Sequence, residues 1–219
     1  MKFTLSILLL FSVLFISCNN DDDAPQEEQE LSEPNFYALT VGNSWRYEYF
    51  RRINRTDQFE SSNAFDDVSI IGTTEVNGNI YFLFETTTTG NDNTNVFVPD
   101  NGTVVTKLRD SAGYLIDENG LKYFSYSNLN QEYLIRDAPA EAKIYGVLAN
   151  IDTNVQVGAG NFVCSVNEHF AKFEDGSVSL GRDFYSYSED IGQIKSTCSF
   201  VSDSLPFAER RLVSYTIAE

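Results

Sequence analysis

The feature that most constrains this chain is a period-two alternation of apolar and polar residues, which recurs throughout the sequence after Pro34. In the segment 45–50, for example, Trp45, Tyr47 and Tyr49 share one parity. No stretch after Pro34 places apolar residues at the i, i+3, i+4, i+7 spacing of a helix over three turns. Such alternation is typical of antiparallel strands with one face on a core and one face in water.

Turn signals divide these runs into separate strands. Asn77-Gly78 lies between the runs Val68–Glu75 and Asn79–Thr88. Asn-Gly between two such runs is a strong hairpin signal because both residues tolerate positive φ. Similar signals at 110–113 and 119–120 predict three further strands in sequence, and strands joined by such short turns form a meander.

One segment is an exception, because Ala138–Leu148 favours a short helix. Pro139 suits the first turn of a helix, and the residues that follow it are good helix formers. The predicted fold class is therefore all-β: an antiparallel meander that forms a curved sheet, with at most one or two short helices. The curved sheet can be a closed or half-open barrel or a sandwich, and the sequence leaves this choice open.

Residues 1–17 are typical of a signal peptide. A lysine at position 2 precedes the apolar run Phe3–Ile16, which is too short to span a bilayer comfortably. The run ends at Phe15-Ile16-Ser17-Cys18, which resembles a bacterial lipoprotein signal. The resemblance implies cleavage before Cys18 and acylation of Cys18, as in a palmitoylated cysteine. Two or three acyl chains hold a protein on a membrane. The alternative is an ordinary secretory peptide that leaves Cys18 free.

Residues 18–33 are predicted to be a flexible, solvated tether, because they contain seven acidic and no basic residues. The start Cys18-Asn19-Asn20-Asp21-Asp22 also resembles the export signal of surface-exposed lipoproteins of Bacteroidota. The alternative is a spacer with no sorting content. The expected location is the outer membrane, with a lipid anchor and surface exposure, and the periplasmic face is the second option. Residues 34–219 are predicted to form a single β domain.

A second resemblance covers most of this domain. Its segments look like ones that recur in uncharacterised all-β surface lipoproteins of Bacteroidota; they are Leu39–Tyr47, Val155–Phe162 leading to Cys164, and Tyr187 with Asp190–Lys195. No activity and no catalytic residue come with this resemblance.

Charge and motifs exclude several function classes. The chain has 15 Lys and Arg against 32 Asp and Glu, so it lacks the basic surface that nucleic-acid binding needs. It has one histidine, which excludes a multi-histidine metal site, and no nucleophile, dinucleotide or Walker motif is present. We therefore predict no cofactor, no metal site, no catalytic residue and no nucleic-acid partner.

Acidic pairs leave a carboxylate-based hydrolase as a less favoured alternative, since glycoside hydrolysis needs two carboxylates. The pairs are Asp66-Asp67, Asp117-Glu118, Glu174-Asp175 and Glu189-Asp190. We interpret them as surface residues next to turns.

Several other polar features receive structural interpretations. We interpret His169, on the polar parity of its run, as facing solvent or hydrogen bonded rather than as a general base. The loop 90–95 is interpreted as a hairpin end rather than a calcium site, because it lacks the glycine and the terminal glutamate of an EF-hand loop. Four arginines near the first run are expected either to pair with nearby acids or to contact an anion or lipid headgroup. They are Arg46, Arg51, Arg52 and Arg55.

The two remaining thiols, Cys164 and Cys198, are candidates for a disulfide in an exported domain. If the segment 177–187 lies between their strands, they are about 9.6 Å apart, whereas a bridge needs Cα atoms within about 7 Å. Buried free thiols fit the sequence equally well. Ser111 and Ser204, each directly after an aspartate, resemble acceptors of O-linked glycans in Bacteroidota.

The leading functional hypothesis is a lipid-anchored envelope lipoprotein with a non-catalytic β domain. Its predicted partner is an apolar or carbohydrate ligand or another protein, because concave β-folds commonly hold ligands. Trp45, Tyr47 and Tyr49 are candidates for a ligand platform, and a simple core role is the alternative. A structural or accessory subunit of an outer-membrane assembly is the second hypothesis.

Overall fold

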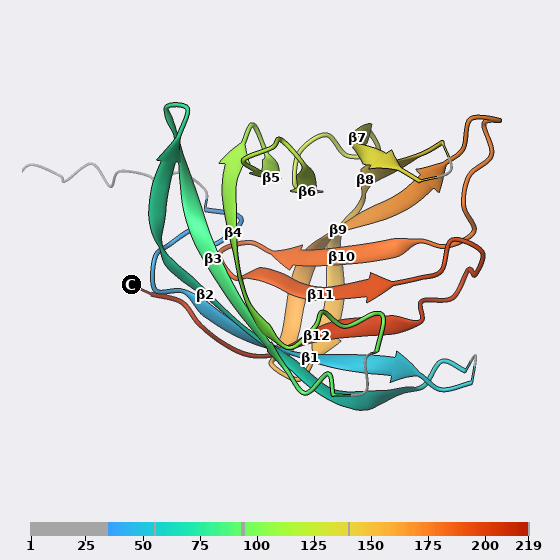
Figure 1. Ribbon diagram of the computed structural model, residues 1–219, viewed down its shortest axis with the longest axis horizontal. Helices are drawn as coiled ribbons and strands as arrows, with labels where there is room; N and C mark the ends of the chain where they lie inside the picture. Colours follow the sequence, from blue (N-terminus) through green and yellow to red (C-terminus); the bar gives the residue numbers. More distant parts are fainter. Residues whose placement is uncertain (1–34, 55, 93–94, 140, 219) are drawn as a thin grey trace, which may run out of the picture. The chain divides into compact units, whose positions relative to one another are not determined.

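The computed structural model describes residues 35–218 except 55, 93–94 and 140 (Figure 1). The predicted signal peptide, Cys18 and the tether of residues 18–33 lie outside the described residues, as does Arg55. Among the described residues there is no helix of the length and apolarity that a membrane crossing requires.

Residues of the described part form twelve strands and no helix, which confirms the all-β prediction. The strands are β1 (Ser44–Arg52), β2 (Phe59–Val76), β3 (Asn79–Thr89), β4 (Gly102–Ser111), β5 (Tyr114–Asp117), β6 (Lys122–Ser125), β7 (Glu132–Ala138), β8 (Ala142–Val157), β9 (Gly160–Lys172), β10 (Asp183–Ser188), β11 (Gly192–Cys198) and β12 (Ala208–Thr216).

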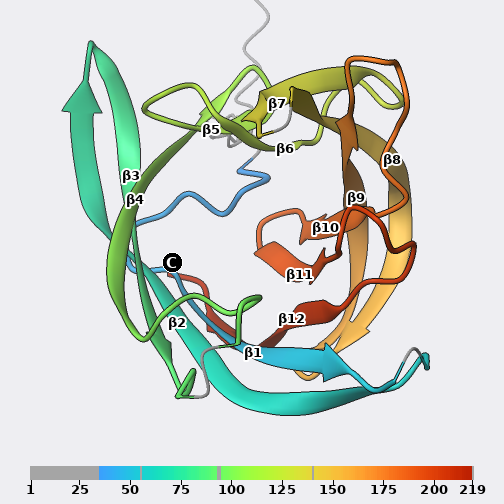
Figure 2. The same ribbon diagram turned by 45° about the vertical axis from the view of Figure 1, so that its right-hand side comes forward.

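All twelve strands belong to one antiparallel sheet. Their order is β6-β5-β4-β3-β2-β1-β12-β11-β10-β9-β8-β7. The chain therefore runs from β1 in the middle to one edge at β6, continues at the opposite edge with β7, and ends with β12 beside β1. The sheet curls until its two edges approach each other and enclose a central space (Figure 2). Of the architectures that the sequence leaves open, the structure is the barrel.

The hairpin predicted from Asn77-Gly78 is confirmed. It joins β2 to β3, and the two turn residues have φ of 51° and 77°. Both residues of a type I′ turn have positive φ, and Asn and Gly adopt this conformation at low cost. The meander predicted after residue 103 is also present, as β4, β5 and β6.

The helix predicted over Ala138–Leu148 is wrong. β7 ends at Ala138 and β8 begins at Ala142, so Pro139 lies in the turn between the two strands. β8 pairs with β7 on one side and with β9 on the other. Local helix propensity is worth less than about 1 kcal/mol per residue, and these two ladders of hydrogen bonds override it.

A close approach at Gly146 gives a further reason for the strand. Tyr133 of β7 lies directly opposite Gly146 of β8, and its ring crosses over the glycine. A Cβ atom at Gly146 would lie 2.4 Å from the Tyr133 Cζ atom. The bare backbone of Gly146 therefore lets the Tyr133 hydroxyl reach beyond β8 to β9.

The segment before β1 runs across the inside of the sheet (Figure 2). Phe36 and Tyr37 pack there against Leu108, Leu115 and Phe124 from β4 to β6. The Tyr37 hydroxyl donates a hydrogen bond to the Gly113 carbonyl at 2.8 Å. This segment therefore fills part of the enclosed space and contributes aromatic rings to its wall.

One side chain connects the two edge strands, β6 and β7. No ladder joins β6 to β7 in the described part of the chain. Asn167 of β9 instead accepts a hydrogen bond from the Ser125 N–H of β6 at 3.0 Å and donates one to the Ser125 carbonyl at 2.7 Å. Tyr133 donates to the same Asn167 oxygen at 2.6 Å. Asn167 has the same parity in β9 as His169, which is the polar parity of this run in the sequence. It nevertheless faces the interior and is 0% exposed.

We expect Asn167→Ala to lower the free energy of unfolding by about 3 kcal/mol. The substitution leaves the Ser125 N–H, the Ser125 carbonyl and the Tyr133 hydroxyl without their partner, and a buried unsatisfied group costs about 1–3 kcal/mol. Urea denaturation measures the change. Asn161→Ala, at an exposed position of the same strand, is the matched control and should change stability by less than about 0.5 kcal/mol. Equal effects of the two variants would contradict the closing role of Asn167.

Candidate functional site

A cavity of about 510 Å³ occupies the space enclosed by the sheet. Its wall draws on β1 to β6 and on β10 to β12, so residues from opposite sides of the barrel face each other across it. Eight of the lining residues are aromatic: Tyr37, Trp45, Tyr47, Tyr49, Phe84, Tyr123, Tyr185 and Tyr187. The volume lies within the range of about 300–1,000 Å³ that is typical of small-molecule pockets.

Trp45, Tyr47 and Tyr49 share one face of β1 and are 4%, 3% and 7% exposed. Their alternation with outward-facing residues places all three on the cavity wall. The indole N–H of Trp45 donates to the Ile191 carbonyl at 2.6 Å, and its ring stacks on Phe84 with centroids 6.0 Å apart. The three rings therefore belong to the core and also line the cavity. Their role as a ligand platform stays a prediction.

An ion pair lies in the wall of this cavity. Asp66 of β2 and Arg210 of β12 meet through a 2.7 Å contact between Oδ2 and Nε, and their side chains are 4% and 16% exposed. Tyr49 donates to Asp66 Oδ2 at 2.8 Å and Thr88 donates to Oδ1 at 2.7 Å. The carboxylate is therefore fully compensated by a cation and two hydroxyl groups.

Arg210 also contacts the aromatic wall. Its guanidinium lies 3.6 Å from the centroid of the Tyr47 ring, and Nη1 donates to Gln193 Oε1 at 2.8 Å. Burial raises the pKa of Tyr47 to about 12, against the opposing effect of the Arg210 charge. Burial raises the pKa of Tyr49 as well. Both phenols therefore stay neutral hydrogen-bond donors at physiological pH.

The two cysteines of the domain are free in the structure. Cys164 is in β9 and Cys198 ends β11, and β10 lies between these strands. This is the arrangement for which the sequence predicted a separation too large for a bridge. Burial raises the pKa of each thiol to about 11, so neither is a reactive nucleophile at neutral pH.

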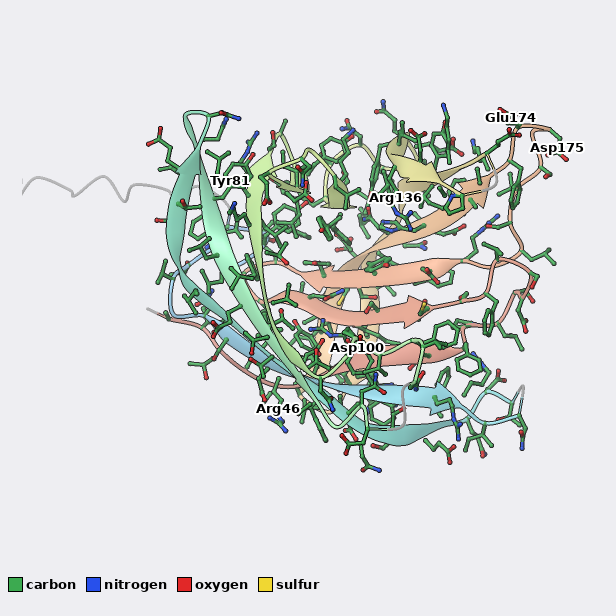
Figure 3. All side chains as sticks on the ribbon, viewed as in Figure 1. Arg46, Tyr81, Asp100, Arg136, Glu174 and Asp175 are labelled. Atoms are coloured by element: carbon green, nitrogen blue, oxygen red, sulfur yellow. The ribbon has the colours of Figure 1, made fainter. Side chains whose placement is uncertain are left out.

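The acidic pairs do not converge on the cavity. Asp66 faces inward, whereas its neighbour Asp67 faces outward and pairs with Arg46 at 2.7 Å. Glu174 and Asp175 lie at the tip of a turn beyond β9 (Figure 3). Glu118 pairs with Lys107 at 3.3 Å on the surface.

Three of the four arginines near the first strand, Arg46, Arg51 and Arg52, pair with acids, which is one of the two interpretations given for this group. Arg51 contacts Glu60 at 2.7 Å and Arg52 contacts Asp57 at 3.5 Å. Arg46, which points outward (Figure 3), takes Asp67 as its partner.

The loop 90–95 is organised by an amide rather than by acids. Asn91 is 8% exposed, and its Nδ2 donates to the Val98 and Pro99 carbonyls, each at 3.0 Å. Asn93 and Thr94 lie outside the described residues. No group of three or more His, Cys, Asp or Glu side chains that could hold a metal ion occurs in the part of the chain that the structure describes.

The two candidate glycosylation residues lie at turns. Ser111 ends β4 and is half-buried, and Ser204 is exposed between β11 and β12. Their modification stays a prediction.

No protein-family model matches the chain, and no curated protein matches its sequence. Two solved structures match the fold. One is a "putative exported protein with YmcC-like fold" from Bacteroides fragilis, at 11% identity and a TM-score of 0.51. The other is a "putative lipoprotein" from Parabacteroides distasonis, at 9% identity and a TM-score of 0.53. Each match covers 84% of this chain and 99% of the other chain. At these identities the likeness shows a shared fold.

We expect Arg210→Met to lower the free energy of unfolding by about 3 kcal/mol, because removing one partner of a buried pair leaves the other charge uncompensated. The double variant Asp66→Asn, Arg210→Met should recover most of this loss. Chemical denaturation of the single and double variants measures the coupling. Arg46→Met breaks the exposed Arg46–Asp67 pair between β1 and β2 and serves as the control, with an expected change below about 1 kcal/mol. Additive effects of the Asp66 and Arg210 substitutions would contradict the pairing.

Proposed function

We propose that this chain is a lipid-anchored lipoprotein of the cell envelope whose β domain holds a small apolar ligand without transforming it. The observation that supports ligand binding most directly is the cavity of about 510 Å³ with its eight aromatic lining residues. The lipoprotein-like sequence Phe15-Ile16-Ser17-Cys18 supports the anchor. The two structural neighbours, a "putative exported protein" and a "putative lipoprotein", support this location.

Four polar groups of the wall, those of Tyr37, Tyr47, Tyr49 and Asp66, are already hydrogen bonded, which favours an apolar ligand over a carbohydrate next to them. Tyr37 and Tyr47 donate their hydroxyl protons to backbone carbonyls, and Tyr49 donates to Asp66. Both oxygens of Asp66 are already occupied. A sugar needs free donors and acceptors for its hydroxyl groups, whereas aromatic faces can pack against an apolar ligand without them.

A binding role is favoured over a hydrolytic one. Asp66 is the one carboxylate among the described residues that line the cavity. Carboxylate-based glycoside hydrolysis uses two carboxyl groups flanking the scissile bond. The role of an accessory subunit in an outer-membrane assembly stays a prediction from the sequence.

Trp45 makes the ligand hypothesis directly testable, because it is the single tryptophan of the chain and lines the cavity. We expect a brominated fatty acid to quench Trp45 fluorescence in a saturable manner, since bromine quenches an indole only at short range. Oleate should displace the quencher, while glucose and galactose should not. Thr106→Phe, which adds bulk to the cavity wall, should weaken quenching at least tenfold.

Val105→Phe is the matched control, because Val105 precedes Thr106 in β4 and is 47% exposed. This variant should bind the brominated fatty acid like the unmodified protein. Quenching that does not saturate, or that is the same in the Thr106 and Val105 variants, would argue against a ligand in this cavity.

The anchor is tested separately by Cys18→Ser. In a host that acylates its lipoproteins, we expect the unmodified chain to fractionate with membranes and the Cys18→Ser variant to become soluble. Two or three acyl chains give essentially permanent attachment, and the variant has none. Cys164→Ser is the control and should stay with the membrane. Mass spectrometry of the N-terminal fragment that finds a free thiol at Cys18 would refute the anchor.

A further inference from the structure

A second cavity, of about 240 Å³, opens inside the barrel where β7 to β10 come together. Its polar lining residues include Arg136, His169, Asp183 and Ser199. Tyr123 and Tyr185 line both this cavity and the larger one, so their rings form the boundary between the two. Apart from these two tyrosines, the two cavities share no lining residue.

The strand register brings the polar side chains to one face. Asp183 of β10 lies directly opposite His169 of β9. His169 in turn lies opposite Gly146 of β8, and Arg136 of β7 lies opposite Ile144, two residues away on the same face of β8. Figure 3 shows Arg136 reaching from β7 toward β10. Three different chemical groups therefore point into one small space.

Asp183 carries an oxygen without a partner. Its Oδ1 atom is buried and receives no hydrogen bond. Burial raises the pKa of Asp183 to about 6, against the effect of hydrogen bonds from Ser199. A buried carboxyl oxygen without a donor is costly. Asp66 in the larger cavity shows the contrast, since donors occupy both of its oxygens.

His169 offers a second acceptor. Tyr133 donates its one hydroxyl proton to Asn167 at 2.6 Å, and its oxygen lies 3.4 Å from His169 Nε2. A neutral imidazole has one donor and one acceptor nitrogen, so His169 can accept one hydrogen bond. Burial lowers the pKa of His169 to about 3, so the ring remains neutral. Tyr185 packs against the same ring, with centroids 4.3 Å apart.

Arg136 supplies the complementary group. Its guanidinium has no ion-pair partner among the described residues, yet it acts electrostatically on the Tyr185 phenol. A guanidinium presents five N–H donors and no acceptor. The cavity thus combines acceptors on β9 and β10 with two cationic donors, Arg136 on β7 and Lys122 on β6.

We propose that this smaller cavity binds one sugar ring or a polyol of similar size. Neighbouring hydroxyl groups can donate to Asp183 Oδ1 and to the acceptor nitrogen of His169, while a ring or hydroxyl oxygen accepts from Arg136. The faces of Tyr123 and Tyr185 provide apolar contact for the C–H groups of the ring. A simple ammonium ion would meet the charge of Arg136, and a simple anion would meet that of Asp183. A neutral polyhydroxylated molecule satisfies all three groups together.

His169 provides the reporter, because it is the one histidine of the chain. Its imidazole C–H resonances are followed by NMR in a tag-free Cys18→Ser protein. The probes are the methyl glycosides of glucose, galactose, mannose and N-acetylglucosamine, together with myo-inositol. Methylammonium and acetate are the ionic comparators. We expect at least one of the neutral probes to shift the His169 resonances in a saturable manner. Because the ring does not titrate near neutral pH, such a shift reports binding.

Asp183→Asn should weaken the binding of that probe at least tenfold, while Asp175→Asn, at an exposed turn, should leave it unchanged. Trp45 fluorescence checks that each variant is folded, and it also separates this site from the larger cavity. If Asp183→Asn does not fold, the titration of the unsubstituted site still decides. His169 resonances that respond to none of the neutral probes up to their solubility, or only to methylammonium or acetate, would overturn the proposal.

Discussion

The barrel depends on the way its two edge strands are held together. β6 and β7 follow each other in the chain but share no ladder, so the sheet would otherwise present two open edges. Unpaired strand edges invite pairing with other chains. The amide of Asn167 substitutes for a ladder by bonding both the N–H and the carbonyl of Ser125. Closure therefore fixes the position of β9, whose side chains line one end of the interior.

The same closure explains why glycine and tyrosine are placed as they are. Tyr133 of β7 can reach Asn167 of β9 because Gly146 has no side chain, which leaves room for the tyrosine ring to cross over β8. The Tyr133 oxygen then also contacts His169, which lies opposite Gly146 in the register. A structural contact thus fixes the orientation of a side chain in the smaller cavity. The contacts that connect β6 and β7 through Asn167 and the proposed polar site are parts of one hydrogen-bond network.

Local features of this fold could be predicted from the sequence, and its long-range contacts could not. Alternation and Asn77-Gly78 predicted the strands and the hairpin correctly, because both signals act within a few residues. The parity rule failed at Asn167, since it assumes that polar residues face water. Asp66 and Arg210 are 144 residues apart, so only the folded sheet brings them together. The helix prediction over Ala138–Leu148 failed because strand pairing outweighs local propensity.

The location of a carboxylate is more informative here than the number of carboxylates. With 32 acidic residues the sequence offers many candidate acids, and most of those in the structure lie at turns or in surface pairs. Two of them, Asp66 and Asp183, line the two cavities inside the barrel. Asp66 is matched by Arg210 and two hydroxyl groups, so its cavity presents mainly aromatic surface to a ligand. Asp183 lacks a donor at Oδ1, so the smaller cavity retains the capacity to bind one. The two cavities therefore differ chemically because the carboxylate of Asp66 has partners at both oxygens, whereas that of Asp183 has none at Oδ1.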